Sequence, residues 1–242
     1  MLALPKHPFP VKTIFRSCFL VNFAIDPEVM QSLLPRPIEV DLFDGEAYLS
    51  IVIARMDRMR PAFAPRILGI SYNQVVYRVV VRCQGERGVH FLRSDADNPL
   101  MCVAGNAMSF FRFHYSHMRF HKEGAGLSFD LQAAPNDHAD IHATFTPGCE
   151  AHTMPSSSRF SSLADAQQYL VELFAAFTSD LKTERISTVR INRGIWNISV
   201  VEDSRAQYDY MQNRSPFTHE TTRLDSIFYV EDLPYYWHRL NH

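Results

Sequence analysis

Two strand pairs in the first half of the chain limit its fold more than any other feature. The first pair is joined by Asp44-Gly45, a dipeptide typical of a two-residue hairpin turn with positive φ. The second is joined by a glycine-containing turn over residues 84–88. Tight turns of this kind join antiparallel strands, so the pattern predicts hairpins rather than alternating strands and helices. The predicted strands are residues 38–43, 46–55, 71–83 and 89–95.

The remaining residues add further strands and two substantial helices. One helix begins at Asn98-Pro99, and the other begins at Ser162 and carries an apolar stripe that extends to Leu181. A shorter helix begins at Asp26 and is stopped by Pro35. The other predicted strands are residues 14–25, 113–121, 127–132, 140–145, 190–201 and 226–231. We therefore predict a single domain over residues 1–242, mainly β with an α+β composition, built as an antiparallel β-barrel.

Composition excludes several classes of protein. The 242 residues include 24 basic and 26 acidic ones, so no electrostatic feature supports a nucleic-acid partner. The four cysteines are too widely spaced for a zinc site or a disulfide scaffold, and we expect free thiols in a reducing compartment. Prolines interrupt the first ten residues, and no apolar run is long enough to span a membrane. We expect a cytoplasmic protein without a bound cofactor or metal.

Lysine is absent between Lys12 and Lys122, whereas the same stretch contains twelve arginines. A buried lysine is the residue that forms a Schiff base with a carbonyl substrate. An interior built from this half of the chain must therefore use other side chains, such as arginine, histidine and glutamine.

The segment from Phe111 to His121 has the densest run of polar and aromatic residues. If it is a strand, Arg112 and His114 share one face, and a buried Arg112 needs an anionic partner. If it is a helix, His114, His117 and His121 share a face at metal-ligand spacing. The aromatic content favours the strand, with packed or exposed histidines rather than a metal site.

Three other polar residues interrupt predicted strands. Gln74 and Arg78 share one face of the 71–83 strand, and Arg16 lies on the 14–25 strand. Interior arginines could bind a carboxylate or phosphate through bidentate hydrogen bonds. The same arginines could instead lie outside the barrel, in solvent or paired with acidic residues of a neighbouring strand. A C-terminal aromatic cluster at residues 233–237 is either a ligand-stacking surface, a subunit contact or packing of the chain end.

Several segments, in order, resemble the uncharacterised YqjF-like family within the acetoacetate decarboxylase-like superfamily. The similarity is clear over about residues 14–120 and looser beyond them. It consists mostly of apolar and turn positions, which indicate the fold more than the function. The matching segments are LLP at 33–35, EVDLFDGEAYLSIV at 39–52, RM at 55–56, SYNQV at 71–75 and GVHFL at 88–92.

The resemblance implies an antiparallel barrel with a cone-shaped interior, often in an oligomer. In the decarboxylase, one of two adjacent lysines forms the Schiff base, and a glutamate and an arginine assist. An approximate alignment sets the lysine pair against residues 111–114, the glutamate against Gln74 and the arginine against Arg16. An arginine cannot form the imine, so the resemblance implies that decarboxylation by this mechanism is absent.

The sequence leads to two principal hypotheses. In the first, the barrel binds a small anionic organic molecule, lined by Arg16, Gln74, Arg78, Arg112 and His114. If this protein is an enzyme, His114 is then the proton-transfer group and Arg112 the electrostatic partner. In the second, side chains fill the interior and the protein has a non-catalytic structural or interaction role.

Overall fold

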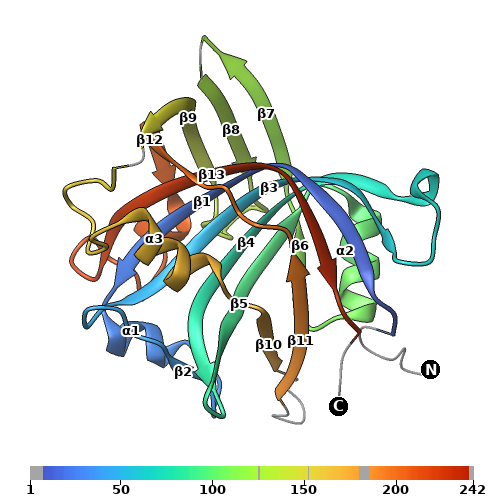
Figure 1. Ribbon diagram of the computed structural model, residues 1–242, viewed down its shortest axis with the longest axis horizontal. Coiled ribbons are helices and arrows are strands. Elements are labelled where there is room, and N and C mark those ends of the chain that lie inside the picture. Colours follow the sequence, from blue (N-terminus) through green and yellow to red (C-terminus); the bar gives the residue numbers. More distant parts are fainter. Residues whose placement is uncertain (1–7, 125, 152, 180–185, 240–242) are drawn as a thin grey trace.

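The structure is a computed structural model, which describes residues 8–124, 126–151, 153–179 and 186–239. Its strands are β1 Val11–Ile25, β2 Glu39–Val40, β3 Ala47–Pro61, β4 Ile70–Cys83, β5 Glu86–Ala96, β6 Phe113–Tyr115, β7 His117–Glu123, β8 Gly126–Gln132, β9 Ile141–Ala151, β10 Ala175–Ser179, β11 Ile186–Arg193, β12 Ser199–Tyr208 and β13 Thr222–Trp237 (Figure 1). Its helices are α1 Pro27–Ser32, α2 Pro99–Met108, α3 Leu163–Ala166 and α4 Asp209–Gln212, with a 3-10 turn η1 at Arg66–Leu68 and a π-helical turn η2 at Gln167–Val171. The prediction of a mainly β chain is confirmed.

Strand pairing forms a ring. The order β1-β3-β4-β5-β10-β11-β13 is continuous, and β1 also pairs with β13. The contact between β1 and β13 is long, whereas β5 and β10 share only the pairs Val89–Ala176 and His90–Phe177. These seven strands are called the ring below. Its inner face carries one of the two hydrophobic cores.

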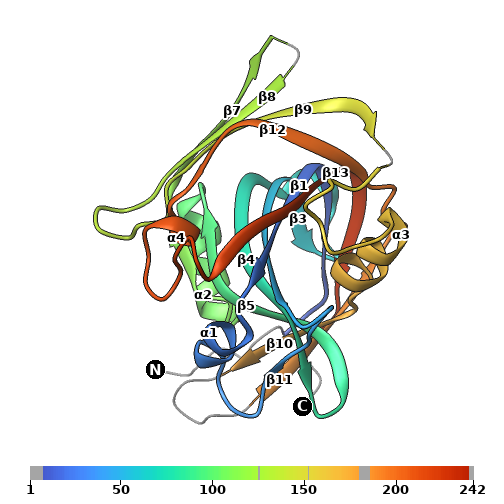
Figure 2. The ribbon, with the colours of Figure 1, turned by 90° about the vertical axis from the view of Figure 1, so that its left-hand side faces the viewer.

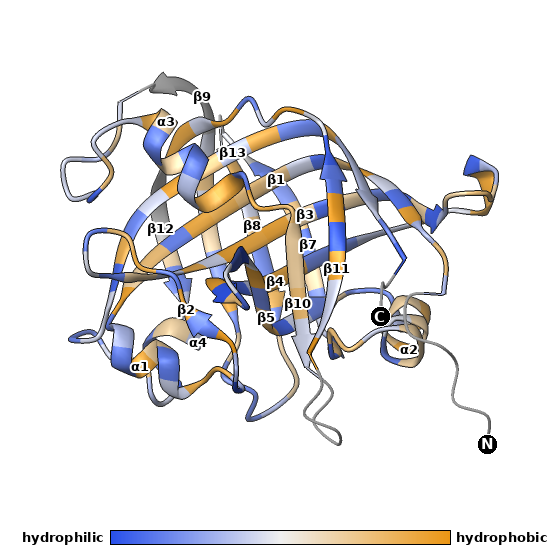
Figure 3. Ribbon diagram, turned by 60° about the horizontal axis from the view of Figure 1, so that its bottom comes forward, coloured by the Kyte–Doolittle hydropathy of each residue, from blue (hydrophilic) through white to orange (hydrophobic). Residues whose placement is uncertain are grey.

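The strands β7, β8, β9 and β12 make a second layer, whereas β2 and β6 pair with β4 and β5 of the ring. From β13 the sheet continues through β12, β9 and β8 to β7, and these strands arch over the outer face of the ring (Figure 2). The second hydrophobic core fills the space between the layers, where Phe19 of β1 stacks on Phe145 of β9 at 4.1 Å. Hydrophobic side chains along β1, β3 and β13 therefore serve both cores. Figure 3 shows the orange, hydrophobic stretches along β1 and β3.

The sheet is mixed, so the purely antiparallel expectation was wrong. Strand β5 pairs in parallel with β6 on one side and with β10 on the other. Parallel pairs need a crossover connection, and the long connection between β5 and β10 contains α2 and the second layer's first strands. The alternation of apolar and polar residues within a strand cannot predict these parallel pairs, because it does not specify which strand lies beside it.

Local signals placed two helices correctly. Asp26 caps α1 by accepting from the amides of Glu28 and Val29, and Asn98 caps α2 by accepting from the amide of Met101. The helix predicted from Ser162 is shorter than expected: it ends at Val171, and Ala175–Ser179 forms β10. Leu181, the predicted end of that stripe, lies outside the described residues.

The first predicted hairpin has the right turn but the wrong partner. Asp44 and Gly45 have φ values of 49° and 80°, as a two-residue turn requires. Beyond the Phe43–Glu46 bridge, however, β2 pairs with β4 and not with β3. The second hairpin is confirmed, with a turn at Gln84-Gly85 that is tighter than the predicted five residues.

Candidate functional site

Most side chains on the inner face of the ring are apolar, and the polar exceptions define the candidate site. On β4, Gln74, Val76, Arg78 and Val80 all face inward and are buried. The period-2 alternation predicted from the sequence puts them on one face, and the ring turns that face inward.

Arg78 and Gln74 are the most deeply buried of the candidate residues, each with 5% of its surface exposed. Arg78 donates a hydrogen bond of 2.9 Å from its Nη2 to the carbonyl oxygen of Leu170, at the end of η2. Its Nε–H is buried and has no acceptor among the described residues. Burial, and then the like charge of Arg193, lower the pKa of Arg78 to about 10. Arg78 is therefore still a cation at neutral pH.

Arg193, at the end of β11, is a second, half-buried cation on the inner face of the ring. It follows Val189 and Ile191 on the inward face of its strand. Its Nη2 donates to the carbonyl oxygen of Leu173 at 2.8 Å, while its Nη1 is buried and has no acceptor among the described residues. The guanidinium lies 5.0 Å from the ring centre of Trp196.

Unpaired N–H donors therefore gather in this part of the interior. Besides the two arginines, the indole Nε1 of Trp196 is buried and lacks an acceptor among the described residues. The nearby Cys18 thiol stays protonated, because burial raises its pKa to about 12 against the opposing effect of the two arginines. No carboxylate of the described residues forms an ion pair with Arg78 or Arg193.

A cavity of about 210 Å³ lies at the end of the ring that α2 covers. Its walls are mainly apolar and include Met101 and Met108 of α2. Gln74 also lines it, with its Oε1 accepting from the Tyr72 hydroxyl at 3.2 Å. Trp237, from the C-terminal aromatic cluster, lines it as well, and its buried Nε1 has no acceptor among the described residues. The cavity is apolar with donors at its edge, the usual pattern of a small-molecule site.

The structure divides the predicted Arg112–His114 pair. Arg112 is exposed and lies beside His90, on the outer side of β5. Phe113 lines the α2 cavity. His114 turns toward the buried pair Arg93–Asp95 and lies 3.9 Å from Asp137. Arg112 and His114 therefore do not form one site, because Arg112 adopts a left-handed conformation (φ 49°) that breaks the strand alternation.

His114 is nevertheless electrostatically perturbed. Partial burial and then the charge of Arg93 lower its pKa, so the ring is neutral at neutral pH. Its position on β6, next to the ion-pair network, gives it no contact with the α2 cavity.

Arg16 faces away from the interior. Its guanidinium is 43% exposed and pairs with Asp57 at 2.9 Å and with Asp232 at 2.7 Å. It follows the inward-facing Phe15, so the pleat directs it outward. Arg82, near the end of β4, likewise pairs with an acidic residue, Asp41. Of the predicted ligand-binding residues, Gln74 and Arg78 alone face the ring interior.

The histidines at 114, 117 and 121 are distributed over two strands. His121 faces Asp130 at 3.4 Å, and His117 lies against Tyr115. Within the described part of the chain, no three His, Cys, Asp or Glu side chains are arranged to hold a metal ion. The helical alternative fails because residues 113–123 form β6 and β7.

Sequence reasoning missed Arg193, Trp196 and Cys18. Arg193 could have been found, because it shares a face with Ile191 within the predicted 190–201 strand. Trp196 lies in the irregular segment between β11 and β12, where no periodicity indicates its direction. Its contact with Arg193, three residues earlier, depends on the path of that segment.

Comparison with known proteins agrees with this architecture. The acetoacetate decarboxylase of Legionella pneumophila superposes with a TM-score of 0.66 over 100% of this chain and 90% of its own, at 14% identity. The enduracididine biosynthesis enzyme MppR, in a structure complexed with pyruvate, superposes with a TM-score of 0.63 over 97% of this chain and 90% of its own, at 9% identity. At such identities the likeness concerns the fold. Within the described residues, no helix is both long and apolar enough to cross a bilayer.

Sequence comparison identifies the family. The uncharacterized protein YqjF of Bacillus subtilis is 21% identical over 180 residues, which cover 74% of this chain and 71% of that protein. The model of the DUF2071 family, described as an uncharacterized conserved protein, matches residues 13–241. The chain therefore belongs to the DUF2071 family of uncharacterized conserved proteins.

Proposed function

We propose that this protein binds a small anionic organic molecule inside the ring, which acts as a barrel around it. The observation that carries the proposal is the pair of interior arginines, Arg78 and Arg193, which have no carboxylate partner among the described residues. A buried charge without a counter-ion is costly, and a bound anion would supply that counter-ion.

The unpaired donors favour a carboxylate. Nε of Arg78, Nη1 of Arg193 and Nε1 of Trp196 offer three N–H groups without acceptors among the described residues. A carboxylate has two oxygens and about four lone-pair positions, so it can accept all three. The lining of the cavity beside α2 includes Gln74, which shares a face of β4 with Arg78, but it includes neither arginine. We propose that this cavity receives the apolar part of the ligand. Pyruvate, which is bound by the structural neighbour MppR, is a carboxylate of this class.

The surroundings of the two arginines favour binding over proton transfer. The pKa of the Cys18 thiol is about 12, and the pKa of the Tyr72 hydroxyl is raised even further by burial. Neither group can act as a base at neutral pH. Of the two lysines within the described residues, Lys122 is exposed and Lys12 does not line the α2 cavity. We therefore propose binding without an imine intermediate.

Intrinsic fluorescence tests this function directly, because both tryptophans of the chain, Trp196 and Trp237, adjoin the proposed site. Pyruvate and acetoacetate should change the emission saturably, and Trp196→Phe should remove most of the signal. Arg78→Met should weaken binding at least about thirtyfold, since loss of one partner of a buried charge pair costs about 2 kcal/mol or more.

Arg16→Gln is the matched control, because it removes an arginine that faces outward. Circular dichroism should first establish that both variants fold. Equal affinities of Arg78→Met and the unaltered protein would refute the assignment. Absence of any saturable change with either anion would favour a filled, non-catalytic interior instead.

A further inference from the structure

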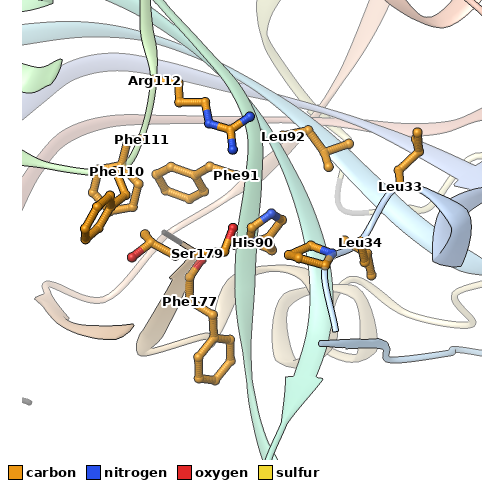
Figure 4. A pocket seen from close by; sticks show the side chains of 12 residues that line it. Leu33, Leu34, His90, Phe91, Leu92, Phe110, Phe111, Arg112, Phe177 and Ser179 are labelled. Atoms are coloured by element: carbon orange, nitrogen blue, oxygen red, sulfur yellow. Dashed lines mark hydrogen bonds between the residues drawn. The ribbon is translucent and has the colours of Figure 1, made fainter. Parts of the chain in front are cut away.

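A second cavity, of about 260 Å³, lies outside the ring, on the face of β5 opposite Val89. It opens between β5, β10, the loop after α1 and the loop before β6. Figure 4 shows Phe91, Phe110, Phe111 and Arg112 along one side and Leu33, Leu34 and Leu92 along the other, with His90 between them. The cavity is therefore lined by apolar side chains together with polar ones, which are Arg112, His90, Thr178 and Ser179.

Arg112 is held at this cavity by its backbone. Its φ of 49° is a left-handed conformation, which is strained for a residue other than glycine. Its side chain has no hydrogen bond or ion pair with any described residue, yet its charge lowers the pKa of His90. A strained backbone that presents a guanidinium without a partner among the described residues to a cavity is typical of a functional position.

His90 is fixed in one orientation. Its Nδ1 lies 3.0 Å from the carbonyl oxygen of Phe177, so Nδ1–H is the donor and Nε2 remains an acceptor. Burial and then the charge of Arg112 lower the pKa of His90, so the ring is neutral at neutral pH. The cavity therefore carries a single positive charge, on Arg112.

The aromatic pair Phe91 and Phe111 separates this outer cavity from the α2 cavity. Both residues line both cavities, and their ring centres are 4.7 Å apart. A ligand in the outer cavity would thus contact neither Gln74 nor Arg78. The two cavities are distinct sites for binding.

We propose that the outer cavity binds a small aromatic carboxylate, with the carboxylate on Arg112 and the aromatic ring among the phenylalanines and leucines. The guanidinium forms short, charge-assisted hydrogen bonds with a carboxylate. The phenylalanine rings favour edge and offset contacts with a planar ligand. The volume suits a molecule smaller than a drug-sized ligand.

Nuclear magnetic resonance of the histidine side chains tests this proposal with phenylacetate as the probe. In protein labelled with ¹⁵N-histidine, the His90 signals are assigned with His90→Gln. Phenylacetate should shift them saturably, and 2-phenylethanol, which lacks the charge, should bind at least about tenfold more weakly. Arg112→Gln should weaken phenylacetate binding by a similar factor.

Two further variants separate this site from others. Arg119→Gln removes an exposed arginine on β7 and should leave the affinity for phenylacetate unchanged. Arg78→Met should also leave it unchanged, whatever its effect on binding inside the ring. The proposal is overturned if His90 signals do not move, if 2-phenylethanol binds equally well, or if Arg112→Gln retains the original affinity.

Discussion

Loss of one partner from the buried ion pair between Arg93 and Asp95 should strongly destabilise the protein. Arg93 is 4% exposed and Asp95 is fully buried, and the two are joined by hydrogen bonds of 2.6 and 2.7 Å. Ser116 donates a third hydrogen bond to Asp95 at 2.8 Å. Removing the charge with Asp95→Asn keeps the shape but leaves a buried guanidinium with a weakened partner.

The size of the effect follows from this geometry. Breaking a buried ion pair costs about 3–5 kcal/mol, and the lower end applies because Arg93 keeps a hydrogen bond of 2.7 Å to Asp137. For a chain of 242 residues the unfolding entropy is roughly 0.5 kcal/mol per kelvin, so a loss of about 3 kcal/mol lowers Tm by about 6 °C. Differential scanning calorimetry at pH 7 measures the shift.

Asp137→Asn is the matched control. Asp137 is 30% exposed and accepts one hydrogen bond from the same arginine, so its loss should lower Tm by about 2 °C or less. If the two variants have the same Tm, or if Asp95→Asn equals the unaltered protein, the burial argument is refuted.

Three further results are expected. Borohydride reduction in the presence of acetoacetate should add no mass to the protein, and an adduct on any lysine would contradict the proposed function. Because the pKa of His114 is lowered on folding, the unfolded chain takes up a proton near pH 6.5 before the folded one does. The free energy of unfolding, measured by urea titration, should therefore fall as the pH is lowered from about 7.5 to 5.5. In His114→Asn this fall should be smaller. An equal fall in the variant and the unaltered protein would contradict the prediction. A Cβ on Gly88 would lie 2.5 Å from the carbonyl oxygen of Ala175, whereas one on Gly194 would meet nothing closer than 3.5 Å. Gly88→Ala should then cost about 1–3 kcal/mol in unfolding free energy, and Gly194→Ala much less.

The ring interior shows how far sequence reasoning reaches toward the candidate site. The alternation of β4 placed Gln74 and Arg78 on one buried face, and the structure turns that face inward. The same reasoning could not separate Arg78 from Arg16, because each is an arginine on an apolar strand. The difference lies in neighbours remote in sequence: Asp57 and Asp232 pair with Arg16, whereas the acceptor of Arg78 is a backbone carbonyl of η2.

Local chemistry determined much of this protein by itself. Asp26 and Asn98 cap helices, and Gly45 and Gly85 turn the chain, because each effect depends on residues a few positions apart. The lysine-free stretch likewise needs no structure to be recognised.

Only the tertiary structure decided which strands meet and what lies between them. β5 and β10 pair in parallel through two residue pairs, and no local pattern specifies a partner so remote in sequence. Likewise, no local pattern specifies that Arg78 of β4 and Arg193 of β11 lie near each other. Side-chain direction is a local property of a strand, whereas the group that a side chain faces depends on how the whole sheet closes.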